Sequence, residues 1–313
     1  MGALLRLPNF SEHSNIRNAW VFALSWFAIT ASLADALSIG LPQLHERAPD
    51  ASLSTRATCS ARPAGLKLPA PGTTWDYVLK NPIAKPSEID TSISVWAIDL
   101  VDNTAATIST MKVKGANVIC YFSAGSYEDW RPDASKFQPD DLGEELDGWP
   151  GEKWLDIRST NVRNIMQSRL DLAVRKGCNG VDPDNVDGYD NDNGLDLQES
   201  DATDYVIFLA NEAHKRGLTV SLKNAGAIIP DVIDCVDFSV NEQCHQYTEC
   251  STYAAFIKEN KPVFHVEYPK GDDVNNINPV SDAIKNAICK DSTATGFSTI
   301  IKNMNLDDWI QKC

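Results

Sequence analysis

A phrase of basic residues, a glycine and a short apolar run occurs three times in this chain and constrains its fold more than any other feature. The copies read KVKGANVICYF (112–122), VRKGCNGVD (174–182) and HKRGLTVSL (214–222). Cations stabilise the C-terminus of a helix and glycine ends it, while a short apolar run is typical of a buried strand. Residues 161–176 and 201–216 carry the apolar stripes of two such helices. The phrase therefore marks helix-to-strand joints of alternating βα units.

Eight short segments have the character of buried strands. They are residues 94–99, 117–123, 154–157, 180–184, 219–223, 237–241, 262–267 and 298–302. Eight strands that alternate with helices predict a single (β/α)8 TIM-type barrel, whose active site is built where the strands end. Residues 74–313 suit this fold, which typically takes ~250 residues.

The N-terminal region has the features of a targeting segment. Arg6 and Arg17 precede the apolar run 19–34, AWVFALSWFAITASLA, and Ala34-Asp35-Ala36 gives an A-x-A cleavage pattern. The run is shorter than the ~20 apolar residues of a spanning helix, so we expect a secretory signal peptide over residues 1–36. An uncleaved signal anchor is the alternative. Residues 37–73, rich in Pro, Ser, Ala and Arg, are predicted to form a linker.

The charge balance limits the classes of partner that this protein can bind. Against 28 basic residues it has 43 acidic ones, a formal net charge of −15. This charge disfavours nucleic acids and anionic membranes and favours a cationic ligand. The sequence indicates no cofactor and no protein partner.

The eight cysteines form an even set without a C-x2-C zinc pair. In the oxidising compartment that a signal peptide implies, such a set predicts disulfides, and Cys244–Cys250 is the candidate bridge. Cys120 lies in an apolar strand segment and is interpreted as an unpaired core thiol.

The alternation of side chains along the predicted strands places polar groups at the barrel mouth. The outward face of each strand packs against helices, so apolar positions are assigned to the outside. This rule points seven polar side chains inward: Asp99, Tyr121, Asp182, Asp184, Lys223, His265 and Glu267. For Asp182 and His265 the alternative is a hydrogen-bonded polar group of the core.

A run of acidic residues follows the fourth predicted strand. Its members are Asp182, Asp184, Asp187, Asp190, Asp192 and Asp196. An EF-hand calcium loop would need glycine at its sixth position, but a loop from Asp182 has Asp187 there, and one from Asp190 has Gly194 one position early. No metal is therefore predicted, although an irregular cation site stays open, and the last three aspartates are expected in a solvated loop.

Seven ordered motifs resemble those of glycoside hydrolase family 114, the endo-α-1,4-polygalactosaminidases. They are WAIDL (96–100), CYFSAGSYEDWRPD (120–133), EKWLDIR (152–158), GVDPDNVDGY (180–189), SLKNAG (221–226), FSVNEQC (238–244) and FHVEYP (264–269). The resemblance covers residues 75–313. It implies a β/α barrel that cuts galactosamine-rich polysaccharides of the fungal galactosaminogalactan type from within the chain.

By this resemblance the catalytic pair is Asp184, after the fourth strand, and Glu242, after the sixth. The implied roles are nucleophile for Asp184 and general acid/base for Glu242, with retention of configuration by analogy with other barrel glycosidases. Strict alternation from Phe238 and Val240 would turn Glu242 outward unless the strand is bulged. Glu267 is therefore the alternative acid.

Further residues near the predicted mouth are candidates for substrate binding. They are Asp99, Tyr121, Asp182, Asn185, Asp187, Tyr189, Lys223, Asn224, Glu267 and Tyr268. The acids suit the free amines of a cationic galactosamine-containing polysaccharide, and the tyrosines suit sugar stacking or cation–π contacts, with packing as their alternative. Two other functions are weighed: a carbohydrate-binding barrel without catalysis, and a metal-dependent hydrolase, which the absence of an H-E-x-x-H motif disfavours.

Overall fold

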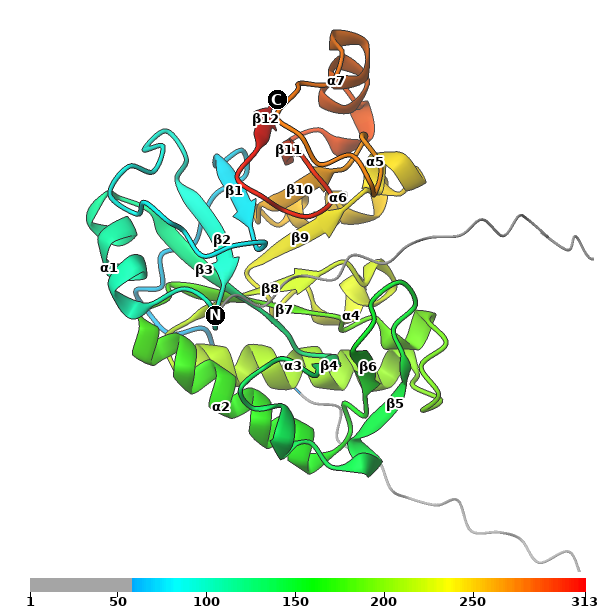
Figure 1. Ribbon diagram of the computed structural model, residues 1–313. Helices are drawn as coiled ribbons and strands as arrows, with labels where there is room; N and C mark the ends of the chain where they lie inside the picture. Colours follow the sequence, from blue (N-terminus) through cyan, green and yellow to red (C-terminus); the bar gives the residue numbers. More distant parts are fainter. Residues whose placement is uncertain (1–57) are drawn as a thin grey trace, which may run out of the picture. The chain divides into compact units, whose positions relative to one another are not determined.

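The computed structural model describes residues 58–313, which form a barrel of eight parallel strands (Figure 1). Its strands, in hydrogen-bonded order, are β1 (Trp75–Val78), β2 (Val95–Asp99), β3 (Asn117–Ser123), β7 (Gly180–Asp184), β8 (Thr219–Lys223), β9 (Phe238–Glu242), β10 (Val263–Glu267) and β11 (Ser298–Lys302). A short strand, β12 (Ile310–Lys312), pairs antiparallel with β11. The predicted barrel is confirmed.

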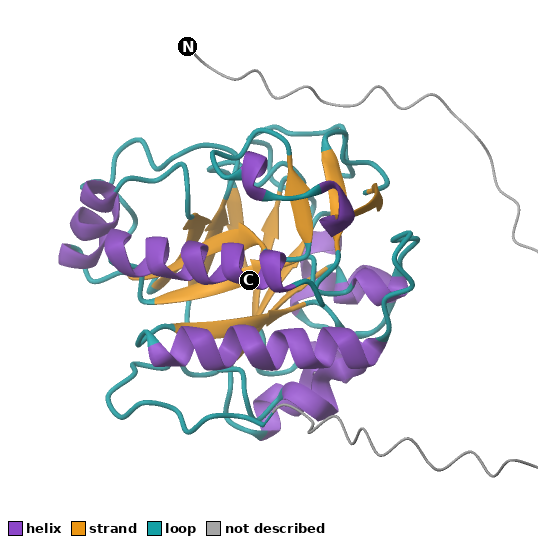
Figure 2. Ribbon diagram, turned by 90° about the horizontal axis from the view of Figure 1, so that it is seen from below, coloured by secondary structure: helices purple, strands orange, loops and turns teal. Residues whose placement is uncertain are grey.

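Helices cover the outside of the strands, as Figure 2 shows. They are α1 (Ala105–Val113), α2 (Thr160–Lys176), α3 (Glu199–Lys215), α4 (Ile229–Val232), α5 (Cys244–Tyr247), α6 (Cys250–Lys258) and α7 (Asp282–Cys289). In α2 the side chain of Ser159 caps the first turn, and Gly177 ends the helix with φ of 84°, a left-handed conformation that glycine adopts without strain. α2 and α3 confirm the helices that were predicted over residues 161–176 and 201–216.

One predicted barrel strand is wrong. Residues 154–157 overlap β6 (Glu152–Leu155), which belongs to a separate antiparallel sheet with β4 (Ser126–Glu128) and β5 (Leu142–Glu145). β1, which the sequence did not single out, is the first barrel strand and keeps their number at eight. Because one strand replaces another, Asp184 still ends the fourth barrel strand and Glu242 the sixth. The three-stranded sheet follows β3 at the carboxyl end of the barrel.

The barrel interior corrects the predicted orientation of β9 and β10. An apolar cluster distinct from the one under the helices joins Phe238, Val240, Phe264 and Val266 to residues of β1, β2, β3 and β11. Below its mouth a small barrel is filled by packed side chains, so apolar residues occupy its inside as well as its outside. Glu242 therefore points inward without any bulge, whereas His265 and Glu267 point outward.

The eight cysteines form four disulfides. The predicted Cys244–Cys250 bridge is confirmed, and the others are Cys59–Cys235, Cys120–Cys178 and Cys289–Cys313. The interpretation of Cys120 as an unpaired thiol is wrong, because its side chain leaves the outer face of β3 and meets Cys178 after α2. An apolar strand position does not exclude a partner that approaches from the covering layer.

The predicted signal segment, residues 1–36, lies outside the described residues. Within the described part of the chain, no helix has the length and apolar character needed to cross a membrane. Residues 58–73 form no helix or strand. Two contacts fasten this end of the predicted linker to the barrel: the Cys59–Cys235 disulfide, and a hydrogen bond from the side-chain amide of Asn211 to the carbonyl oxygen of Thr58. The boundary at residue 73 stays a prediction.

Side chains bridge β1 and β11, which share no backbone ladder. The indole nitrogen of Trp75 donates to the carbonyl oxygen of Ser298 at 2.6 Å, and the ammonium of Lys302 lies 2.7 Å from Oδ1 of Asp76. Both members of this ion pair are buried. The closure of the barrel at this seam therefore depends on specific side chains.

We expect Lys302→Met to lower the free energy of unfolding by about 3–5 kcal/mol, because it leaves Asp76 buried without its partner. The matched control is Lys312→Met, which breaks the exposed Lys312–Asp90 pair and should cost less than about 1 kcal/mol. Urea unfolding followed by circular dichroism measures both. Equal, small losses would show that the Lys302–Asp76 pair does not hold the seam.

Candidate active site

Asp184 ends β7 at the mouth of the barrel. Its Oδ2 accepts hydrogen bonds from the hydroxyl of Tyr121 and from the ammonium of Lys223, each at 2.9 Å, while its Oδ1 accepts from the backbone N–H of Asn185 at 2.8 Å. Tyr121 comes from β3 and Lys223 from β8, the two strands next to β7. Neighbouring strands thus fix one oxygen of this carboxylate, and the backbone directly after β7 fixes the other.

Glu242 ends β9 on the other side of Lys223. Its Oε2 lies 3.1 Å from the ammonium of Lys223, and its Oε1 accepts a hydrogen bond from the hydroxyl of Tyr268, which follows β10. The backbone N–H of Glu242 donates to Oδ1 of Asn224 at 2.9 Å. The side chains of Asp184 and Glu242 keep 15% and 24% of their surface exposed, so ligands can reach both carboxylates.

Lys223 links the two carboxylates and limits their separation. Oxygens that lie 2.9 Å and 3.1 Å from one nitrogen cannot be more than about 6 Å apart. Burial alone would lower the pKa of Lys223, but the charges of Asp184, Glu242 and Asp182 outweigh burial and raise it well above its usual value. The ammonium is therefore a permanent positive charge between two acids.

Asp182 lies one inward position deeper than Asp184 and is fully buried. The hydroxyls of Ser221 and Tyr77 donate to its two oxygens at 2.5 Å and 3.2 Å. Burial and the charge of Asp184 raise the pKa of Asp182 to about 6, against the opposing effect of Lys223. Asp182 is thus a hydrogen-bonded polar group of the core directly beneath the site, which is the alternative that the sequence analysis left open.

A cavity of about 350 Å³ opens beside Glu242. Its polar lining comes from the loops after β7 and β8 and from α6 and the residue before it: Asp187, Tyr189, Asp190, Asn224, Glu249, Thr252 and Tyr253. No lysine or arginine lines it, and burial together with neighbouring carboxylates raises the pKa of Asp187 to about 6. Asn224 connects this cavity to Glu242.

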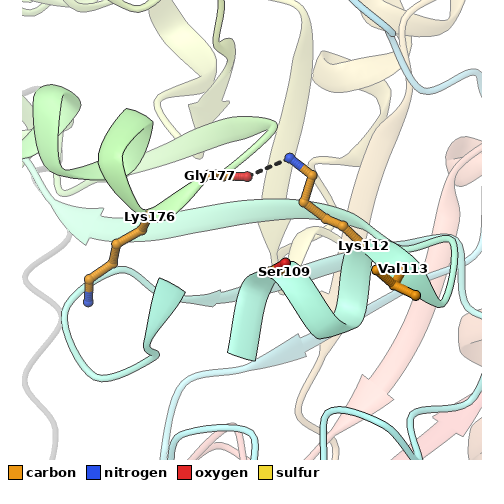
Figure 3. A pocket seen from close by; sticks show the side chains of 5 residues that line it. All are labelled: Ser109, Lys112, Val113, Lys176 and Gly177. Carbon is orange, nitrogen blue, oxygen red and sulfur yellow. Dashed lines mark hydrogen bonds between the residues drawn. The ribbon is translucent and has the colours of Figure 1, made fainter. Parts of the chain in front are cut away.

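A second cavity, also of about 350 Å³, lies between the C-terminal ends of α1 and α2 (Figure 3). Helix C-termini lead into the amino ends of strands, so this cavity lies at the end of the barrel opposite the mouth. Lys112 and Lys176 line it, but backbone carbonyl oxygens already accept from both ammonium groups. It offers no carboxylate and no reactive group.

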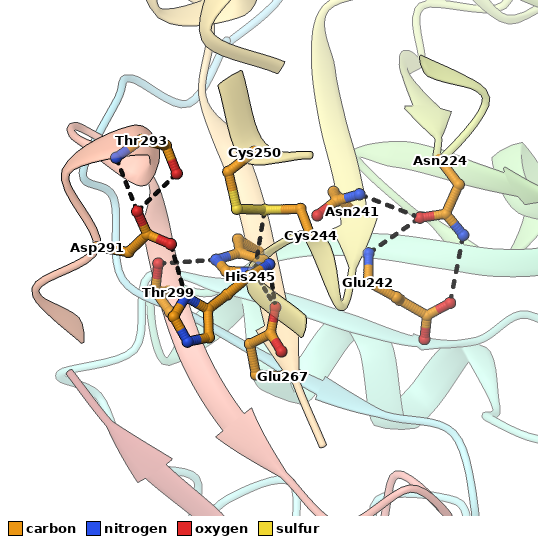
Figure 4. The surroundings of a disulfide bond; sticks show 11 residues. Asn224, Asn241, Glu242, Cys244, His245, Cys250, Glu267, Asp291, Thr293 and Thr299 are labelled. Carbon is orange, nitrogen blue, oxygen red and sulfur yellow. Dashed lines mark hydrogen bonds and ion pairs between the residues drawn. A yellow bond between two sulfur atoms is a disulfide. The ribbon is translucent and has the colours of Figure 1, made fainter. Parts of the chain in front are cut away.

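Glu267 does not reach the mouth. Its Oε1 accepts from the backbone N–H of His245 at 2.7 Å and lies 2.7 Å from Nε2 of His265, on the outer side of β10. Figure 4 shows Glu267 and His245 beside the Cys244–Cys250 disulfide, apart from Asn224 and Glu242. The prediction that strand alternation brings Glu267 and His265 to the site is wrong, for the reason given for β10.

Other candidates reach the mouth with part of their polar groups already engaged. Asp99 accepts two backbone N–H groups and pairs with Arg131 at 2.8 Å, and the amide nitrogen of Asn185 donates to Ser123 and Ser126. Their contacts with a sugar stay predictions. The exposure of Asp190, Asp192 and Asp196 confirms the predicted solvated loop.

Sequence reasoning missed Tyr77, Ser221 and Glu152, which contribute to the site or its support. Tyr77 lies on the strand that was not recognised, so no alternation rule could be applied to it. Glu152 stands in the quoted motif EKWLDIR, but that segment was assigned to the barrel. Ser221 alternates with Lys223 on β8, and this spacing was the one available signal.

This chain is similar to known proteins in sequence and in fold. The sequence model of glycoside-hydrolase family GH114 matches residues 55–313. The crystal structure of Aspergillus fumigatus Ega3 in complex with galactosamine has a TM-score of 0.78 and 54% identity, covering 81% of this chain and 100% of that one. The glycoside hydrolase domain of PelA from Pseudomonas aeruginosa shares the fold with a TM-score of 0.61 at 12% identity, over 77% and 98% of the two chains.

A relative from Deinococcus radiodurans is 26% identical over 175 residues, which cover 50% of this chain and 57% of that protein. The alignment thus spans little more than half the length of this relative.

We expect Asp182→Asn to flatten the pH dependence of stability. The folded-state pKa of about 6 exceeds the unfolded value of about 4, so the stability that the proton on Asp182 provides is complete below about pH 4 and is lost as the pH rises through 6. Between about pH 4 and pH 6, the free energy of unfolding should fall by up to about 3 kcal/mol more in the wild type than in the variant. Urea unfolding across this range measures it, with exposed Asp192→Asn as the control. Identical pH dependence in wild type and Asp182→Asn would contradict the assignment.

Proposed function

The chain belongs to glycoside-hydrolase family GH114, and on this basis we propose that it cleaves α-1,4-linked, galactosamine-rich polysaccharide from within the chain. We assign Asp184 as nucleophile and Glu242 as general acid/base. The observation that carries this assignment is the meeting of the two carboxylates on opposite sides of one buried ammonium, Lys223.

The separation of the carboxylates favours a double displacement with retention. Retaining glycosidases hold their two carboxyl groups about 5–5.5 Å apart and inverting ones about 6.5–9.5 Å, whereas Lys223 limits the nearest oxygens here to about 6 Å. An attacking water on the far face of the sugar would need the wider gap. The geometry therefore supports direct attack by Asp184.

In the first step, Oδ of Asp184 attacks the anomeric carbon while Glu242 gives its proton to the leaving glycosidic oxygen. A covalent glycosyl ester forms on Asp184, and the shortened polysaccharide leaves as an alcohol. In the second step, Glu242 takes a proton from water, whose oxygen displaces Asp184 from the anomeric carbon. Tyr121 and Tyr268, which donate to the two carboxylates, keep them aligned through both steps.

The charge of the site favours a sugar that carries a free amine. The cavity beside Glu242 has three carboxylates, those of Asp187, Asp190 and Glu249, and no basic residue. Tyr189 and Tyr253 add aromatic faces to which an ammonium group is attracted. Galactosamine is bound in the related Ega3 structure, which supports the same class of sugar for this chain.

We further propose that the protein acts outside the cell. Four disulfides persist in oxidising compartments. The predicted signal segment and the polymeric substrate fit the same location, with anchorage through residues 19–34 as the alternative to release.

Asp184→Asn and Glu242→Gln should each lower turnover of a deacetylated galactosamine polymer by at least ~10³-fold, because each removes a group that acts in the transition state. Glu267→Gln is the control and should keep turnover close to wild type, since Glu267 lies outside the barrel. Reducing-end release measures the rates. For the wild type, proton NMR of fresh products should show the anomeric configuration of the substrate.

A carbohydrate-binding barrel without catalysis would show binding but no products in any of these proteins. Full activity of Glu242→Gln, or loss of activity in Glu267→Gln alone, would contradict the assigned acid. Loss of wild-type activity on exhaustive chelation would support the metal-dependent hydrolase instead.

Raising the ionic strength should lower kcat/KM for the deacetylated polymer far more than kcat. Attraction between the acidic mouth and protonated amines is screened beyond a Debye length of about 8–10 Å, whereas the chemical step takes place in a partly desolvated site. The measurement is steady-state kinetics at several salt concentrations, below the amine pKa. A fully N-acetylated polymer is the control, and parallel salt curves for both substrates would show that charge does not steer capture.

A further inference from the structure

A buried chain of hydrogen bonds runs from the three-stranded sheet to the residue after Asp184. The amide nitrogen of Asn185 donates to the hydroxyl oxygens of Ser123 and Ser126, at 3.1 Å and 2.9 Å. These hydroxyls lie 2.5 Å apart, and that of Ser126 donates to Oε2 of Glu152 at 2.7 Å. Each bond in this chain has its donor on the side of Asn185, so Glu152 is the terminal acceptor.

The chain holds a backbone conformation that would otherwise be unfavourable. Asn185 has φ of 58°, in the left-handed region that few residues other than glycine adopt. The backbone N–H groups of Ala124 and Gly125 donate to the carbonyl oxygen of Asp184 at 2.8 Å and 3.0 Å. A Cβ at Gly125 would come within 1.6 Å of the carbonyl oxygen of Asn185, so the two backbones are in direct contact. The position of Asp184 thus depends on this loop.

Glu152 has no cationic partner of its own. Its position on β6 is directly opposite Glu128 on β4, and Arg131 bonds to Glu128 and Asp99 instead. Burial, the charge of Glu128 and the charge of Asp184 together raise the pKa of Glu152 to about 8, although the hydrogen bond from Ser126 and the charge of Arg131 oppose them. At neutral pH this side chain is therefore a neutral acid that accepts through its carbonyl oxygen.

We propose that Glu152 is a positioning residue for catalysis, which acts through Ser126 and Asn185 to hold the nucleophile Asp184. This role rests on the proposed function of Asp184. Above about pH 8 a second negative charge would be buried beside Glu128 and near Asp184. Hydration of that charge would open the contact between the loop 123–126 and Asn185, and the nucleophile would lose its orientation.

The test compares Glu152→Gln and Glu152→Ala. Glutamine keeps a carbonyl oxygen for the Ser126 hydroxyl and cannot ionise. The kcat of Glu152→Gln should therefore stay near the wild-type value at about pH 6. In the wild type, ionisation of Glu152 should lower kcat above about pH 8, and this decline should be absent from Glu152→Gln. Alanine removes the acceptor, and kcat should fall by about 10²-fold with KM close to wild type, because a small misplacement of the nucleophile is costly. Ser126→Ala should lower kcat in the same way and add little to Glu152→Ala.

The matched control is the exposed Glu145, on β5 of the same sheet, whose Gln and Ala variants should not change kcat. A Glu152→Gln enzyme with the wild-type alkaline decline, or a Glu152→Ala enzyme with wild-type kcat, would overturn the proposal.

A second measurement does not depend on the substrate. The pKa of Glu152 is raised on folding, so the melting temperature of the wild type should fall more between about pH 5 and 8 than that of Glu152→Gln. Equal pH dependence of the two melting temperatures would overturn the proposal even if catalysis is lost in Glu152→Ala. If the wild type does not cut the galactosamine polymer, the proposed function fails, but the melting comparison still reports whether Glu152 is held neutral.

Discussion

The active site depends on one buried ammonium group. Lys223 is 2% exposed and lies about 3 Å from a carboxylate of each neighbouring inward strand end, Asp184 on β7 and Glu242 on β9. With Asp182 beneath, three acids converge where little solvent can screen their repulsion. The positive charge of Lys223 makes this convergence possible, and its central position also limits the distance between the carboxylates of Asp184 and Glu242.

The carboxylates of Asp184 and Glu242 are supported from different directions. Behind Asp184 the loop after β3 and the three-stranded sheet form a network that ends at Glu152. Around Glu242 the support comes from Asn224, from the hydroxyl of Tyr268, and from a chain path that enters the Cys244–Cys250 bridge two residues later. Support on both sides lets the two acids lie at strand ends, where substrate can enter, and still keep fixed positions.

The acidic run 182–196 separates into two parts with different environments. Asp182, Asp184 and Asp187 are buried or half-buried around the mouth, where burial and mutual repulsion raise the pKa of Asp182 and Asp187 to about 6. Asp190, Asp192 and Asp196 are exposed in the loop that follows. The first group surrounds the carboxylate of Asp184, and of the exposed group only Asp190 also lines the cavity beside Glu242.

The sequence by itself determined the alternation of helices and strands, because helix ends and strand starts are signalled by nearby residues such as Lys176 and Gly177. It also placed Asp184, Tyr121 and Lys223 correctly, since on β3, β7 and β8 polar residues alternate with apolar ones. Only the tertiary structure decided which face of β9 and β10 is inside, because apolar residues fill the barrel core as well as its outer layer. The tertiary structure also decided the places of β1 and Glu152. β1 pairs with β2 and is joined to β11 through side chains, whereas Glu152 reaches Asn185 through Ser126. These contacts join segments that are distant in the chain, so no local sequence pattern encodes them.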